Sequence, residues 1–134
     1  MNTVEDAYSA IGDALLSSVT GGWDALVFTS LILGKVCSSM QTSQLVNTEF
    51  KSIGLGFKNA FVVNDAAIYL RDDLLRTTGD RIWGLTFTLF PTGKFKIEYD
   101  YNKPEGYEET NETISIGDAL SSLQAIVGSA KPAQ

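Results

Sequence analysis

The sequence predicts an α+β fold in a single domain spanning residues 1–134: a curved antiparallel sheet of about five strands with helices, in the order α-β-β-β-α-β-β-α. Three observations predict it. Apolar residues recur at helical spacing in three separate segments. Two strand-like runs meet at the short turn Pro91-Thr92-Gly93, which requires an antiparallel pair. The 134 residues, of which 44% are hydrophobic, suffice for one core.

The first segment is predicted to be a helix. Thr3 and Asp6 have the spacing of a capping box, in which each side chain satisfies a free backbone amide at the start of a helix. Gly21-Gly22 ends the helix. One apolar face is expected to be formed by Val4, Ala7, Tyr8, Ile11, Ala14, Leu15 and Ser18.

Three strands are expected next. The β-branched and aromatic run Trp23–Leu33 is apolar on both faces, which predicts a central strand covered on two sides. After a turn at Gly34-Lys35, the segment Val36–Thr42 is predicted to be a second, weaker strand. The segment Gln44–Phe57 is interpreted as a third strand, broken near Gly54 and Gly56.

A second helix is predicted to begin at Asn64, a good N-cap, with Asp65 favourably placed at the positive end of the helix dipole. Gly79 is expected to end it. Its buried stripe is predicted to be Ala66, Ala67 and Leu70 with Leu74 and, on the flank, Leu75, while Arg71, Asp72, Asp73 and Arg76 face water.

The runs Ile82–Phe90 and Lys94–Tyr101 are predicted to form a half-buried hairpin, because apolar and polar residues alternate with period two. A last helix over Ser115–Gly128 and a frayed tail at residues 130–134 are expected to follow. The inward residues of the hairpin are predicted to be Trp83, Leu85, Phe87 and Leu89 on the first strand and Phe95, Ile97, Tyr99 and Tyr101 on the second.

The composition argues against catalysis. The chain has no histidine and one cysteine, Cys37, so it lacks the residues for Ser-His-Asp or Cys-His chemistry and for an internal disulfide. Cys37 is expected to be a small buried residue. The prediction is a protein that is not an enzyme and has no cofactor or metal. The acidic start of the chain and the short apolar run Ala25–Gly34 predict a cytoplasmic protein without a membrane span.

Negative charge is concentrated in one stretch. Seven acids and one base, Lys103, lie between Glu98 and Asp118, an excess equal to the net charge of −6 of the whole chain. One interpretation is a solvated loop that keeps the protein soluble. The other is a docking surface for a basic partner, which would be steered by the field of the acids. The candidate partner-binding residues are Glu98, Asp100, Glu105, Tyr107, Glu108, Glu109 and Glu112.

Two runs of the hairpin carry a family resemblance: Trp83-Gly84-Leu85-Thr86-Phe87-Thr88-Leu89 and Gly93-Lys94-Phe95-Lys96-Ile97-Glu98-Tyr99-Asp100-Tyr101. They resemble the YezG-like family of bacterial immunity proteins, and the helix leading into Trp23 is similar as well. The resemblance implies an antitoxin that binds a cognate toxin domain, often a basic nuclease, and neutralises it by steric occlusion and charge complementarity.

Other classes of function remain open at the level of sequence. A type III secretion chaperone is the alternative, because these chaperones are similarly small and acidic and share this order of elements. An enzyme that uses carboxylates alone is the third class. Direct binding of nucleic acid is disfavoured, because the ten Lys and Arg residues form no basic stripe. The oligomeric state is open, with a monomer favoured.

Overall fold

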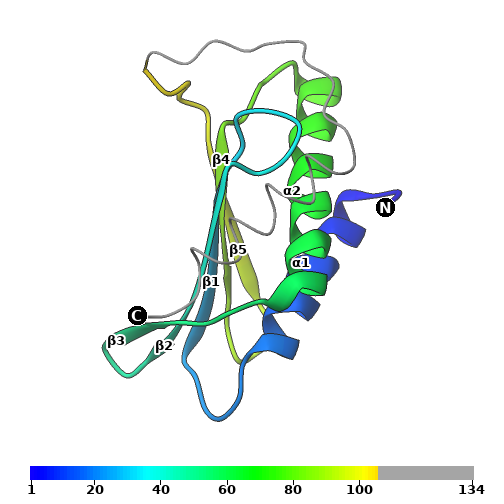
Figure 1. The fold of residues 1–134 in the computed structure, drawn as a ribbon. Coiled ribbons are helices and arrows are strands. Elements are labelled where there is room, and N and C mark those ends of the chain that lie inside the picture. Colours follow the sequence, from blue (N-terminus) through cyan, green and yellow to red (C-terminus); the bar gives the residue numbers. More distant parts are fainter. Residues whose placement is uncertain (106–134) are drawn as a thin grey trace.

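The computed structural model describes residues 1–105, which form two helices and a five-stranded antiparallel sheet (Figure 1). The predicted α+β class and the order of the first seven elements are confirmed. The predicted last helix, Ser115–Gly128, and the tail at residues 130–134 lie outside the described residues. The elements are α1 (Val4–Ser18), β1 (Ala25–Leu31), β2 (Ser39–Val46), β3 (Glu49–Ser52), α2 (Gly56–Thr78), β4 (Gly84–Leu89) and β5 (Phe95–Asp100).

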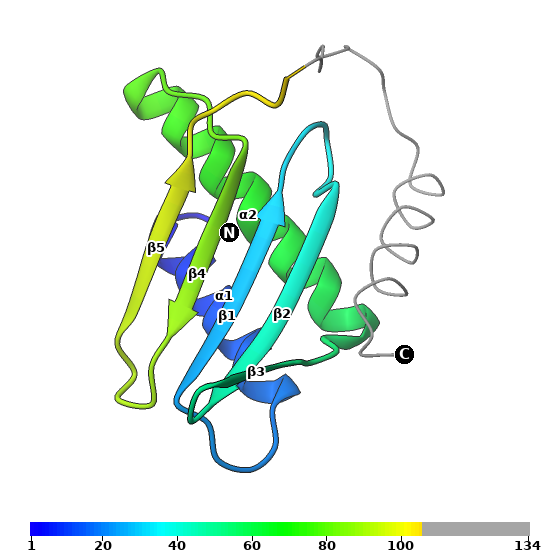
Figure 2. The ribbon, with the colours of Figure 1, turned by 90° about the vertical axis from the view of Figure 1, so that its left-hand side faces the viewer.

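The strands lie in the order β3-β2-β1-β4-β5, so the sheet is open and β3 and β5 are its edges. Both helices cover the same face, and Figure 2 views the sheet from the opposite face. β1 is central, as predicted. The expectation that both its faces are covered is wrong within residues 1–105, because Phe28 is buried under the helices while Thr29 is exposed on the other face.

The core lies between the sheet and the two helices. Its largest fully buried side chains include Phe28 and Phe87 from the central strands and Ile11, Leu15 and Leu70 from the helices. Each such side chain contributes roughly 1.5–3 kcal/mol when it is removed from water. α1 packs along α2, so the helices form one layer and the sheet the other (Figure 1).

The capping box of α1 is confirmed. The backbone amide of Asp6 donates to the Thr3 hydroxyl at 3.1 Å, and the Thr3 amide donates to the Asp6 carboxylate at 3.3 Å. These bonds satisfy amides that have no partner within the helix. Ala7, Ile11, Ala14 and Leu15 are buried, as the apolar face requires. The helix ends at Ser18, three residues before the predicted glycine stop.

The predicted boundaries of β2 and β3 are wrong. β2 continues to Val46, and a turn at Asn47 separates it from β3. Asn47 has φ of +59°, a conformation that asparagine tolerates better than most residues. The backbone N–H of Asn47 also donates to the Asp24 carboxylate at 2.6 Å, and this bond holds the turn against the start of β1. Phe57, predicted in a strand, lies in α2.

Asn64 does not begin α2, which starts eight residues earlier at Gly56. Asn64 is buried in the middle of the helix, where its side-chain oxygen accepts the backbone N–H of Cys37 at 2.8 Å. Two further expectations are wrong on the same helix. The side chains of Arg71 and Asp73 are mostly covered, 14% and 17% exposed, while Leu75 is 46% exposed. Gly79 does end the helix, in the left-handed conformation.

The hairpin is confirmed. The N–H of Phe90 donates to the carbonyl of Lys94 at 2.8 Å, and Gly93 adopts the positive φ that this turn needs. Leu85, Phe87 and Leu89 are buried, as is Trp83. On the edge strand the inward residues are less covered than predicted. Ile97 and Tyr99 are half-buried, whereas Phe95 is 42% and Tyr101 52% exposed.

Candidate functional site

The sheet face turned away from both helices is called the open face. Alternation along each strand and the register between strands place one set of side chains there. Hydroxyl and amide groups lie at the centre of this face together with Val27 and Leu31 of β1. Apolar groups lie at the end near β3, and charged groups lie along the β5 edge. Its residues are Ala25, Val27, Thr29, Leu31, Ser39, Gln41, Ser43, Leu45, Phe50, Ser52, Gly84, Thr86, Thr88, Lys96, Glu98 and Asp100.

A hollow of about 350 Å³ lies on the open face, over the meeting of β1, β4 and β5; it is called the open-face hollow. Two rows of cross-strand partners form its floor and walls. Gly84 pairs with Leu31 on one side and Asp100 on the other, while Thr86 pairs with Thr29 and Glu98. Gly84, which has no side chain, forms part of its floor. Ser39 and Gln41 from β2 complete its wall.

The open-face hollow is acidic at its β5 edge. Glu98 and Asp100 line it, and no Lys or Arg of residues 1–105 does. Lys96, the next residue on the same face, lies 3.6 Å from the Glu98 carboxylate, and both side chains are well exposed. This ion pair is therefore weak. One oxygen of Asp100 accepts the N–H of Asn102 at 2.9 Å. Within residues 1–105 no other hydrogen bond or ion pair of the Asp100 carboxylate is found.

The structure brings only some of the predicted partner-binding residues together. Glu98 and Asp100 share the open face, as the period-two pattern predicted, and Glu105 is exposed beyond the end of β5. Tyr107, Glu108, Glu109 and Glu112 lie outside the described residues. Thr29, Gln41 and Thr86 of the hollow were missed by the sequence reasoning, because only the pairing of distant strands places them beside the two acids.

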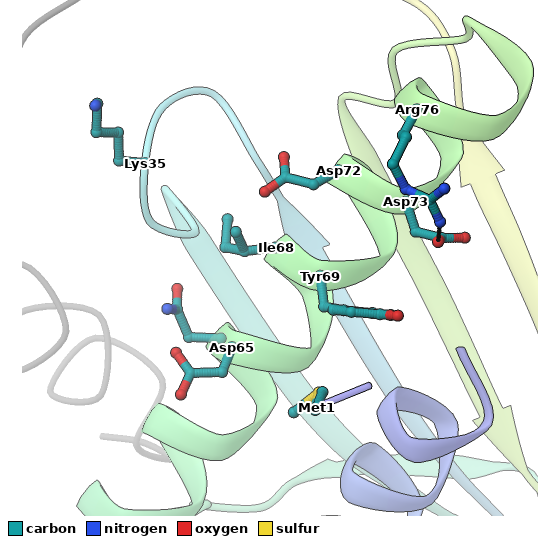
Figure 3. A pocket seen from close by; sticks show the side chains of 9 residues that line it. Met1, Lys35, Asp65, Ile68, Tyr69, Asp72, Asp73 and Arg76 are labelled. Atoms are coloured by element: carbon teal, nitrogen blue, oxygen red, sulfur yellow. Dashed lines mark hydrogen bonds and ion pairs between the residues drawn. The ribbon is translucent and has the colours of Figure 1, made fainter. Parts of the chain in front are cut away.

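A second hollow, of about 540 Å³, lies along the outer surface of α2 (Figure 3). Two of its three acids are paired: Asp73 lies 2.6 Å from the Arg76 guanidinium, and Asp72 lies 3.0 Å from Nε of Arg71, while the third, Asp65, is exposed. The two neighbouring aspartates thus bind separate arginines, because neighbours on a helix point about 100° apart. Since Lys35 and Arg76 line it, whereas no Lys or Arg of residues 1–105 lines the open-face hollow, this hollow is the weaker candidate for binding a cation.

Within residues 1–105, no three acidic, cysteine or histidine side chains are grouped closely enough to hold a metal ion. Cys37 is fully buried, as predicted, and burial raises the pKa of its thiol to about 12. The thiol is consequently protonated at neutral pH, a state that is neither nucleophilic nor metal-binding. The chemistry that the open-face hollow offers is hydrogen bonding and charge pairing.

Neither helix in this part of the chain combines the length and apolarity that a membrane span needs. No protein-family model and no curated protein matches this sequence. The candidate site therefore rests on its own geometry: an exposed, hydroxyl-lined hollow with two carboxylates at one edge.

Proposed function

We propose that this protein is an immunity protein, which binds a basic toxin domain and neutralises it by covering the toxin surface. The observation that carries the proposal is the open-face hollow, where Glu98 and Asp100 stand beside neutral hydroxyl and amide groups. Such a surface is complementary to a guanidinium or ammonium group, whose N–H donors find carboxylate oxygens at the edge and neutral acceptors at the floor.

The mechanism follows from the electrostatics. The excess of negative charge between Glu98 and Asp118 accelerates encounter with a basic surface by long-range attraction. The open face then covers the groove with which a nuclease binds phosphates. Inhibition in this scheme requires only occupancy, so no bond is made or broken. The resemblance of the hairpin to the YezG-like family agrees with this role.

The experiment uses the toxin domain encoded by the reading frame next to this gene. Affinity is measured by calorimetry for the wild-type protein and for the double variant Glu98→Gln/Asp100→Asn. We expect the double variant to bind about tenfold more weakly and with a shallower salt dependence, because two steering charges are lost. The matched control is Asp65→Asn/Asp80→Asn, which removes two exposed acids away from the open face and should bind like wild type.

Two results would count against the proposal. If the neighbouring toxin forms no complex with this chain, the immunity role fails. If a complex forms but the double variant and the control behave alike, the toxin is bound by another surface. The secretion-chaperone alternative gains support instead if sedimentation shows an obligate dimer that binds an extended effector segment rather than a folded domain.

A further inference from the structure

We propose that a groove between α1 and the β4–β5 hairpin binds a segment of another protein in which one bulky apolar side chain is flanked by lysine or arginine. This groove, called the α1 groove, has a volume of about 370 Å³. It is lined by α1 and by the helix-facing residues of β4 and β5, whereas the open-face hollow lies on the opposite face of the sheet. Figures 1 and 2 show α1 and α2 on one face of the sheet only. The inference is thus independent of the proposed function.

The apolar surface of the α1 groove is exposed yet held in place. Leu16 is 49% and Phe95 42% exposed, while Phe87 beneath them is fully buried. The Phe95 ring is stacked on Phe87 with centroids 4.9 Å apart and is tilted against Tyr8 at 5.2 Å. An apolar ligand therefore meets a prearranged wall and does not have to order it on binding.

Gly12 keeps the groove open. It lies inside α1, where glycine is less favourable than alanine by roughly 0.5–1 kcal/mol. A Cβ atom at this position would meet nothing within 4 Å, and φ is not positive, so neither packing nor backbone geometry requires glycine. What the missing side chain does provide is space along the helix surface for a ligand. A residue that is unfavourable for its secondary structure and that no packing contact requires is typical of a functional surface.

The charged residues at the rim of the α1 groove indicate which kind of segment binds there. Glu5 and Asp13 line the α1 groove, and all charged residues of α1 are acidic, Asp6 being the third. Glu5 and Asp13 are eight positions apart in the helix, a distance of about 12 Å along the axis. No Lys or Arg of residues 1–105 lines the groove. A segment with an apolar anchor between two cations matches this arrangement.

The test is an NMR titration of the ¹⁵N-labelled full chain with two synthetic twelve-residue peptides. Both carry a single leucine at the centre, and the remaining positions are lysine in one and glutamate in the other. We expect the lysine peptide to shift the amides of Gly12, Leu16 and Phe95, and the glutamate peptide to bind at least about tenfold more weakly. Equal binding of the two peptides, or shifts confined to other surfaces, would overturn the proposal.

Variants then distinguish the contribution of the apolar wall from that of the acidic rim of the α1 groove. Gly12→Leu fills the groove and should weaken binding of the lysine peptide at least about tenfold. Leu16→Gln, at an exposed helix position, tests the apolar wall without altering the core and should weaken binding as well. Glu5→Gln/Asp13→Asn should flatten the salt dependence. The matched control, Asp65→Asn/Asp80→Asn, removes two exposed acids that line neither the α1 groove nor the open-face hollow, and it should bind like wild type. Wild-type affinity in folded Gly12→Leu or in Leu16→Gln contradicts the assignment.

Discussion

Gly84 lies so close to Ser30 that a Cβ atom at position 84 would be 2.7 Å from the Ser30 carbonyl oxygen. This contact is with backbone, which cannot swing aside as a flexible side chain can. The absence of a side chain at Gly84 therefore serves two purposes. It permits β4 to pair closely with β1 at the centre of the sheet, and it forms the floor of the open-face hollow.

The first prediction concerns this close approach. Gly84→Ala should lower the free energy of unfolding by about 1–3 kcal/mol, because the strands must separate to admit the methyl group. Urea unfolding measures the change. Gly12→Ala is the matched control, since its Cβ enters open space and alanine favours the helix; it should raise stability by roughly 0.5–1 kcal/mol. Unchanged stability in Gly84→Ala would show that the β1–β4 pairing adapts easily.

Local patterns predicted the parts of the fold that depend on neighbouring residues. The capping box of Thr3 and Asp6 and the alternation in β5 needed only short-range information, and both are confirmed. Alternation also placed Glu98 and Asp100 on one face. It did not predict that Thr29 lies beside them, because the pairing of β1 with β4 joins residues more than fifty positions apart. Such register depends on how the whole core packs.

Asn64 shows why a strong local signal failed. Asparagine is favoured at helix starts because its side chain accepts backbone N–H groups. Here it performs the same chemistry at long range, accepting the N–H of Cys37 from the loop between β1 and β2. The actual helix start has no side-chain cap, since Leu55 precedes Gly56. The sequence thus identified Asn64 as an acceptor of backbone N–H groups, but it did not identify Cys37 as the donor.

The second prediction follows from that contact. Asn64→Ala should destabilise the protein by about 1–3 kcal/mol, because the buried Cys37 N–H loses its acceptor. Asn59→Ala is the control on the same helix. The Asn59 side chain donates to the hydroxyls of Ser17 and Ser18 and to the Leu55 carbonyl at partly exposed positions, where water can replace it, so its loss should cost below about 1 kcal/mol. Thermal unfolding compares the two, and hydrogen exchange at Cys37 should accelerate only in Asn64→Ala.

The third prediction concerns the start of α1. Thr3→Ala removes the acceptor for the Asp6 N–H and should cost about 1 kcal/mol of stability. The N–H groups of Asn2 and Thr3 hold the pKa of the Asp6 carboxyl below its ordinary value. This contribution is present above the unfolded pKa and disappears as the pH falls through the folded one. Urea midpoints between pH 6 and 2 should therefore fall less steeply in Asp6→Asn than in wild type.

The fourth prediction is a loss of stability at alkaline pH. Burial raises the pKa of the Cys37 thiol from 9.0 to about 12. Between these values the unfolded chain has released the thiol proton and the folded protein has kept it, so rising pH favours unfolding, by up to about 1.4 kcal/mol per pH unit. The pKa of the Tyr99 phenol is raised as well, first by burial and then by the hydrogen bond with Tyr8. This adds a further loss of stability at pH values above the ordinary tyrosine pKa.

The variant Cys37→Ala distinguishes the effect of the Cys37 thiol from that of the Tyr99 phenol. It lowers stability at neutral pH by leaving a small cavity, but its stability should stay level from pH 8.5 to about 10, where wild type already declines. Tyr99→Phe should retain the early decline and lose the later one. Reaction with a thiol reagent gives an independent readout: native Cys37 should react only as fast as the protein opens, and urea should accelerate it. Rapid modification of the folded protein at pH 8 would contradict the buried, protonated thiol from which this pH profile is derived.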